Sequence, residues 1–152
     1  MKINWTKAII AGVIGTLLFD ILGLFLTGQW WDIPGLLGAK LEVGLAGGVV
    51  AHYGNGVAMA IIYSALAPSL FGPVWFRALS FMTVQTVMGV WLFMLPLLGA
   101  GIAGVKMDAM MPFITLARHF VFAIPLIVLI TVHTGSRKDE ETCEGTCDIP
   151  VV

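Results

Sequence analysis

Three separated apolar stretches of this sequence each carry an ionisable side chain, and these side chains are the first candidates for chemistry. They are Asp20, His52 and the adjacent pair Arg118 and His119. A charge or an imidazole inside hydrocarbon is costly, so such residues in membrane segments usually face the protein interior and mark a functional site. The sequence therefore predicts a polar site enclosed by apolar segments.

The positions of these residues predict that they meet at one level. Counted from the ends of their apolar segments at about 1.5 Å per helical residue, Asp20, His52 and His119 lie roughly 9–12 Å below the same boundary. Gln85 lies deeper, near the middle of its segment, and Asn55 lies one turn below His52. We therefore expect a polar core that consists of Asp20, His52, Asn55, Gln85, Arg118 and His119.

Four long apolar segments must position these residues, and each is long enough to cross a membrane. A spanning helix needs about 20 mostly apolar residues. Only 11% of the residues are charged and 59% are hydrophobic, whereas soluble domains carry roughly 25% charged residues. Short connections favour antiparallel neighbours, so we predict an all-α, integral membrane four-helix up-down bundle over residues 1–134. The predicted helices span about 8–26, 44–66, 78–98 and 112–132.

Two segments lie outside these helices. The connection over residues 27–43 is too short and too broken by proline and glycine to span, so we expect a short interfacial helix there. Its Gln29-Trp30-Trp31-Asp32 run is typical of an interfacial anchor. Residues 135–152 form a polar tail, for which we expect disorder or order only on a partner. Its two cysteines, Cys143 and Cys147, are too few for a closed zinc site.

Basic residues indicate the orientation of the bundle. One side carries five of them and the other side two, which by the positive-inside rule places both termini in the cytoplasm. We expect a bacterial inner-membrane protein in this orientation. The five are Lys2, Lys7, Arg77, Arg137 and Lys138, and the two are Lys40 and Lys106.

A stripe of small residues runs along the second predicted helix, with His52 in its middle. Gly48 and Gly56 lie one turn on either side of His52. One interpretation is a packing seam, because small residues let membrane helices approach closely. The other is that the glycines make room for a flat cofactor beside His52.

Arg118 needs a partner, because a guanidinium inside a helix bundle is costly on its own. Asp20 is the only carboxylate within the predicted helices at that depth. We expect an Asp20–Arg118 ion pair. The alternative is that Arg118 extends to the outer headgroups, which leaves Asp20 protonated or bonded to His52.

Several functions remain open for this polar core. Haem b could be held by His52 and His119 as axial ligands, with Arg118 near a propionate and with Gly48 and Gly56 against the ring. A metal could use Asp20, His52 and His119. A proton-coupled transporter is a third hypothesis, because Asp and His chains form relays in pumps.

The interpretation that we favour is a non-catalytic protein. The sequence has no nucleophile with a base at recognisable spacing, no phosphate-binding loop, and no basic field for nucleic acid at a net charge of −1. We expect an accessory subunit of a larger, possibly electron-transferring, membrane complex, with the lipid bilayer and other subunits as its partners.

Spaced residues over positions 8–132 also resemble those of a group of small bacterial four-helix membrane proteins. The similarity lies in the run from Gly48 to Gly56 with Ala60 to Tyr63, in Leu95 to Gly99, and in the turn around His119. That group has no established activity. The resemblance implies the four-helix fold and makes His52 and His119 its characteristic residues.

Overall fold

The computed structural model describes residues 3–130, which are helical and contain no strand. Four helices in this range are long and apolar enough to cross a membrane, so the prediction of four such segments is confirmed. Their boundaries lie close to the predicted ones, and the tail over residues 135–152 lies outside the described range. The four segments are Trp5–Thr27, Gly44–Ser69, Val74–Leu97 and Met111–Leu129.

Local chemistry sets the ends of the first and third segments. In α1 (Trp5–Thr27), the Asn4 side chain accepts a hydrogen bond from the Lys7 backbone N–H at 3.0 Å, which satisfies one free donor of the first turn. Gly28 ends the helix in the left-handed conformation at φ 71°, which glycine adopts without strain. The third segment begins at Val74, directly after Pro73 and earlier than predicted.

The third segment changes its helical type along its length. It starts as α4 (Val74–Gln85), continues as the π-helical element η2 (Thr86–Met94), and ends as α5 (Leu95–Leu97). A π-helix is rare and is found frequently at functional sites. This change was not predictable, because the residues of η2 are ordinary apolar ones.

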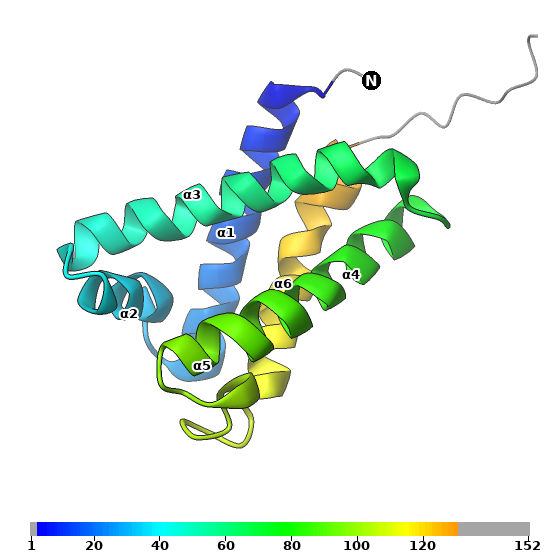
Figure 1. Ribbon diagram of the computed structural model, residues 1–152. Coiled ribbons are helices and arrows are strands. Elements are labelled where there is room, and N and C mark those ends of the chain that lie inside the picture. The colour runs from blue at the N-terminus through cyan, green and yellow to red at the C-terminus, as the bar shows by residue number, and fades with distance from the viewer. Residues whose placement is uncertain (1–2, 131–152) are drawn as a thin grey trace, which may run out of the picture.

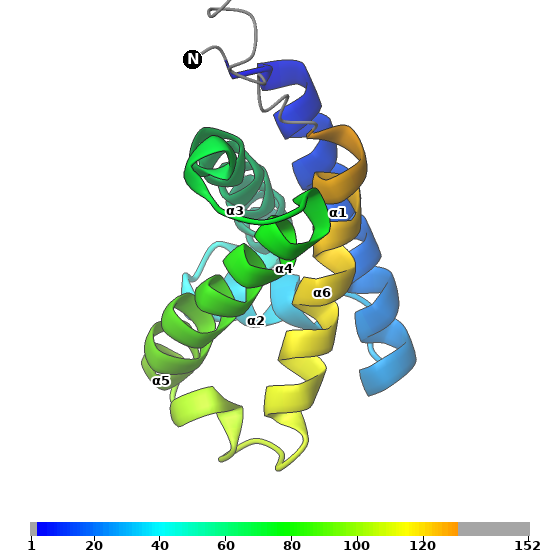
Figure 2. The same ribbon diagram turned by 90° about the vertical axis from the view of Figure 1, so that its right-hand side faces the viewer.

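The four long helices do not pack as parallel rods (Figure 1). α1 lies against both α3 (Gly44–Leu66) and α6 (Met111–Leu129), and α4 lies against α6. α3 and α4 meet at the turn η1 (Ala67–Ser69) and diverge from there, as Figures 1 and 2 both show. The bundle is therefore open on one side, and this splayed arrangement does not establish the regular up-down bundle that we predicted.

The short helix α2 (Asp32–Lys40) folds back along the first half of α3 (Figure 1). Two close backbone approaches hold it there. A Cβ at Gly38 would collide with the Gly44 carbonyl, and a Cβ at Gly48 would collide with the Pro34 carbonyl oxygen. The sequence predicted a helix in this connection, and the structure shows that it packs on the bundle and does not lie apart from it.

α1 and α3 are in close backbone contact. A Cβ at Gly12 would meet the backbone of Val57, and one at Gly56 would collide with Thr16 Oγ1. The Thr16 hydroxyl itself donates to the Gly12 carbonyl at 2.8 Å. Small residues thus bring the two backbones together, and this contact positions the polar residues one turn away.

Apolar side chains divide between a small core and a large exposed surface. Tyr63, Met82 and Leu126 are fully buried near the end where α3 and α4 meet. Many large apolar side chains on the outer faces are instead exposed, among them Phe25, Val50, Phe113 and Val128. An exposed apolar surface of this extent is typical of a protein in contact with membrane.

Candidate functional site

Asp20 and His52 meet between α1 and α3. His52 Nε2 lies 2.9 Å from Asp20 Oδ1, and both side chains are buried. The imidazole and the carboxyl group thus share one hydrogen bond between Nε2 and Oδ1. Thr16 and Gly56 lie one turn from these residues, so the close contact of the two helices is what places the imidazole against the carboxylate.

Arg118 projects from α6 between α1 and α2, where it makes three hydrogen bonds. Its Nη1 and Nη2 atoms donate to Asp32 Oδ2 at 2.7 Å and Oδ1 at 2.9 Å, and its Nε donates to the Phe19 carbonyl at 3.2 Å. The guanidinium also lies 4.2 Å from the centroid of the Phe19 ring. Gly23 gives it space, because a Cβ there would collide with the guanidinium.

The predicted ion pair of Asp20 and Arg118 is present, with Asp20 Oδ1 3.9 Å from Arg118 Nη2. The hydrogen-bonded partner of the guanidinium, however, is Asp32 at the start of α2. Asp20 is also bonded to His52, as the alternative had it, but Arg118 is held inside the protein and does not extend to the headgroups. Sequence reasoning missed Asp32 because this residue lies in a connection, and its level depends on the packing of α2 against α3.

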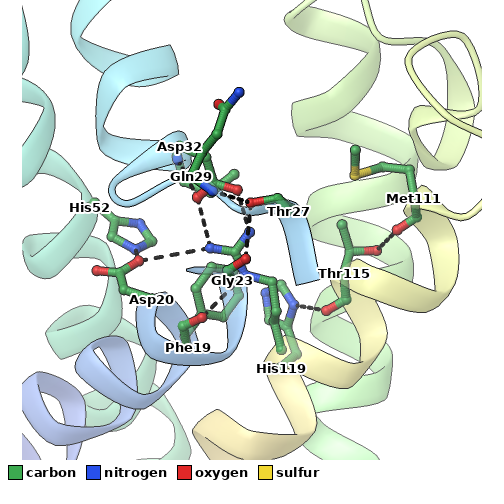
Figure 3. Close-up of polar contacts among 12 residues, drawn as sticks. Phe19, Asp20, Gly23, Thr27, Gln29, Asp32, His52, Met111, Thr115 and His119 are labelled. Atoms are coloured by element: carbon green, nitrogen blue, oxygen red, sulfur yellow. Dashed lines mark hydrogen bonds and ion pairs between the residues drawn. The ribbon is translucent and has the colours of Figure 1, made fainter. Parts of the chain in front are cut away.

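The two pairs form one continuous array. Asp20 Oδ1 contacts His52 on one side and faces the Arg118 guanidinium on the other, and Arg118 continues to Asp32. Figure 3 shows His52, Asp20 and Asp32 around this centre, with Phe19 beside them. Four segments of the chain therefore contribute one ionisable side chain each to this array.

Asp32 remains ionised under most conditions. Burial alone would raise the pKa of its carboxyl group, but the hydrogen bonds and the positive charge of Arg118 outweigh burial and hold this pKa below its usual value of 3.8. The backbone N–H of Ile33 supports the carboxylate as well, at 2.8 Å from Oδ1. The Arg118–Asp32 pair is therefore a true ion pair at neutral pH.

His119 does not belong to this array. Its Nδ1–H donates to the Thr115 carbonyl one turn earlier, at 2.6 Å. The Phe19 ring lies against both imidazoles, with its centroid 5.5 Å from that of His52 and 5.1 Å from that of His119. The predicted pair of histidines is thus brought to one region, but the two side chains contact the same phenyl ring and not each other.

These contacts do not fit haem b with two histidine ligands. The iron and its macrocycle would need the space between the imidazoles, and the Phe19 ring contacts both of them. The Nε2 atom of His52 is also bonded to Asp20. We therefore derive no chemistry through haem from this arrangement.

No group of three or more His, Cys, Asp or Glu side chains that could hold a metal ion occurs within residues 3–130. The set Asp20, His52 and His119 is not assembled around one point, because His119 turns its Nδ1 toward its own helix. The described residues thus give no support to the metal hypothesis.

The glycines beside His52 contact protein atoms. Gly48 faces the backbone of α2 at Pro34 and Gly38, and Gly56 faces Thr16 of α1. These contacts support the interpretation of the stripe as a packing seam.

A pocket with a volume of about 720 Å³ opens where the helices diverge. One wall is α2 with the preceding turn, including Trp31 and Leu36, and the other is the end of α4 with η2, including Gln85 and Phe93. Between these two walls, α1, α3 and α6 form the remaining side of the pocket. They contribute Phe19, His52, Arg118 and His119 to its lining. The volume is within the range of ligand-binding pockets.

Three polar groups on residues that line this pocket lack a protein partner among the described residues. The Trp31 indole nitrogen and the Gln85 amide oxygen are buried and make no hydrogen bond, and Nε2 of His119 makes none either. Asn55, also predicted to be in the polar core, lines the pocket and is exposed. Trp31 was predicted only as an interfacial anchor, and nothing in the sequence indicated that it would face the pocket.

These features define an all-helical protein with four potential membrane-spanning helices and a pocket beside a buried array of ionisable residues. Comparison of the chain with protein-family models, with curated proteins and with solved structures gave no match. The function must therefore be argued from the site itself.

Proposed function

We propose that this chain is an integral membrane protein that binds a lipid-like molecule in the pocket between α2 and η2. The observation that carries the proposal is a pocket of about 720 Å³ whose walls are mainly apolar and which contains a few polar groups without partners. Pockets that hold small molecules have this composition, in which apolar walls supply affinity and a few polar groups fix the orientation of the ligand.

The location of the pocket supports access from within the bilayer. It lies where α3 and α4 diverge, so a molecule dissolved in the membrane could enter between the two helices (Figure 1). The outer faces of these helices carry exposed apolar residues such as Val50 and Val84. A water-soluble ligand would have to cross this apolar surface to reach the pocket.

A pair of glycine substitutions tests this proposal. Gly35 lines the pocket, and a Cβ at Gly35 would meet no atom within 4 Å. Gly54 is equally unobstructed but lies on α3 away from the pocket. Leucine at Gly35 should therefore fill part of the pocket, whereas leucine at Gly54 should not.

The measurement is photoaffinity labelling of the protein in lipid vesicles with a long-chain alcohol that carries a diazirine on its chain. We expect saturable labelling of α2, η2 and α6, which excess unlabelled alcohol removes and which falls at least severalfold in Gly35→Leu but not in Gly54→Leu. Labelling that is spread over the outer faces, does not saturate and is equal in both variants would contradict the proposal.

The role as an accessory subunit remains a second proposal. An accessory subunit of an electron-transferring membrane complex could hold a lipid or a quinone in this pocket, so the two roles are compatible. Purification from native membranes in mild detergent tests it. Recovery of a stable assembly with other subunits would support the role, and recovery of the chain alone would count against it.

We propose that the protein lies in a bacterial inner membrane with both termini in the cytoplasm, and the distribution of its basic residues supports this orientation. Lys40 and Ser69 are exposed residues at opposite ends of the α3 segment. In a chain whose native cysteines are replaced by serine, Lys40→Cys should react with a membrane-impermeant maleimide in intact cells. Ser69→Cys should react only after permeabilisation, and the reverse pattern would invert the orientation.

A further inference from the structure

We infer that the molecule bound in this pocket carries a hydroxyl group at its polar end and donates a hydrogen bond from it to His119 Nε2. This inference rests on the proposed function, because it specifies the ligand of the same pocket. It follows from the hydrogen-bonding capacity that the protein leaves unused around the pocket.

The charged groups beside the pocket are already paired with one another. Arg118 makes two hydrogen bonds to Asp32 and one to the Phe19 carbonyl, and Asp20 is bonded to His52. An anionic headgroup would have to compete with Asp32 for Arg118, and a cationic one would have to compete with Arg118 for Asp32. Because both exchanges break a buried ion pair, the arrangement favours an uncharged polar end.

His119 offers an acceptor to the pocket. Its Nδ1 faces the Thr115 carbonyl at 2.6 Å, and a carbonyl can only accept, so the proton is on Nδ1. In the neutral imidazole the other nitrogen, Nε2, then carries a lone pair. A ligand that reaches His119 in this state must therefore supply a donor, and an ether, ester or ketone has none.

Gln85 and Trp31 can form hydrogen bonds with the oxygen of a ligand hydroxyl group. The Trp31 indole N–H can only donate, and the Gln85 amide can donate or accept according to the orientation of its terminal bond. Both side chains line the pocket and have a buried polar atom without a partner. A hydroxyl donates once and accepts up to twice, so it can satisfy His119 and one of these groups together.

The register of α6 against the third span places Gln85 near the level of His119. Trp91 Nε1 donates to Thr115 Oγ1 at 2.8 Å, which fixes the two antiparallel segments opposite each other at that point. Gln85 precedes Trp91 by six residues and His119 follows Thr115 by four. At about 1.5 Å per residue the two side chains lie within roughly one helical turn of the same level.

The remainder of the ligand must be apolar, since the walls contributed by α2 and η2 present side chains such as Leu36, Val90 and Phe93. An alkyl or isoprenoid chain that ends in an alcohol or a phenol has the required chemistry. A single hydroxyl at the polar end is the feature that the pocket would select.

A matched pair of probes tests the inference on the unaltered protein. 4-Decylphenol and its methyl ether, 4-decylanisole, share the ring and the chain and differ in the hydroxyl proton. Their affinities are measured for the protein in nanodiscs by competition against the diazirine alcohol. We expect the phenol to bind about tenfold more tightly, because the ether leaves buried polar groups without a partner.

Substitution of His119 tests whether this residue causes the tighter binding of the phenol. His119→Leu should bring the affinity ratio of phenol to ether close to one, while Met111→Leu, a change to another pocket-lining residue of α6, should keep the ratio near ten. A ratio near ten in His119→Leu would overturn the assignment to His119. If that variant does not fold, the comparison of the two probes on the unaltered protein still decides the question of the hydroxyl.

The outcomes separate this inference from the proposed function. Binding of both probes with equal affinity would overturn the inference and leave pocket binding in place. Absence of saturable binding of either probe, together with unsaturable labelling by the diazirine alcohol, would overturn both.

Discussion

Asp20 and His52 contact each other at 2.9 Å across the interface of α1 and α3, although 32 positions separate them in the chain. The contact forms because small residues one turn away let the two backbones approach closely. The second carboxylate oxygen of Asp20, Oδ2, is buried and has no hydrogen-bond partner among the described residues. The pair is therefore a buried and incompletely satisfied polar contact.

Replacement of Asp20 by asparagine should destabilise the fold but leave the pocket intact. The amide keeps the shape of the carboxyl group but changes the hydrogen bonds that it can make with His52, and a buried polar group left without a partner costs about 1–3 kcal/mol. We expect a lower midpoint of thermal unfolding in detergent and unchanged labelling by the diazirine alcohol. Loss of labelling with an unchanged midpoint would contradict this assignment.

The same variant distinguishes pocket binding from proton-coupled transport. Our account predicts no uptake driven by a pH gradient into liposomes that contain the unaltered protein. A pH-driven flux that is abolished in Asp20→Asn would instead favour the relay in which Asp and His chains move protons.

Gly23 should be intolerant of even one added methyl group. A Cβ at this position would collide with the Arg118 guanidinium, which is held by Asp32 and the Phe19 carbonyl and cannot move without loss of those bonds. We expect Gly23→Ala to destabilise the protein by about 1–3 kcal/mol, the usual cost of overpacking. Denaturant unfolding measures the difference.

Gly54→Ala is the matched control for that variant. Gly54 also lies inside a helix, and a Cβ there would meet nothing within 4 Å. Alanine has the higher helix propensity, by about 1 kcal/mol, so this substitution should be neutral or stabilising. Equal stabilities of the two alanine variants would contradict the close contact between the Arg118 guanidinium and Gly23.

The long helices were predictable from the sequence, whereas the hydrogen-bonded partner of Arg118 was not. Apolar length alone locates a spanning helix, and the common depth of Asp20 and His52 is consistent with their contact, while His119 at the same depth lies on the other side of the Phe19 ring. Asp32 lies in a connection, and the close contacts of Gly38 and Gly48 bring that connection back against the bundle, where Arg118 binds it. Such contacts depend on tertiary packing and leave no periodic pattern in the sequence.

The pocket was equally beyond sequence reasoning. It depends on the divergence of α3 from α4 and on the π-helical turns of η2, whose residues are as apolar as those of an ordinary helix. Gln85 was predicted to be in the polar core from its depth alone, and it lines the pocket. Phe19, whose ring contacts His52, His119 and Arg118, carried no signal because a phenylalanine in an apolar helix is unremarkable.

The ion pair of Arg118 and Asp32 gives the protein a defined sensitivity to acid. The pKa of Asp32 lies below 3.8 in the folded protein, so its carboxylate contributes stability that is fully present above the unfolded pKa. This contribution is lost as the pH falls through the lower folded pKa. Asp32→Asn should therefore unfold with a weaker dependence on pH below about 4 than the unaltered protein.

Glu42→Gln provides the comparison for that experiment, since Glu42 is exposed. Its acid unfolding curve should follow that of the unaltered protein. If the acid unfolding curve of Asp32→Asn matched those of Glu42→Gln and the unaltered protein, ionisation of the Asp32 carboxylate would contribute nothing to stability.

The central claim is that Arg118 fastens α2 to the helix bundle through Asp32, and a double-mutant cycle tests it most directly. The cycle compares the unfolding free energies of the unaltered protein, Arg118→Met, Asp32→Asn and the double variant. We predict that the double variant is much less destabilised than the sum of the single variants, with a coupling energy of about 1–3 kcal/mol. Additive effects, with no coupling between the two positions, would contradict the account.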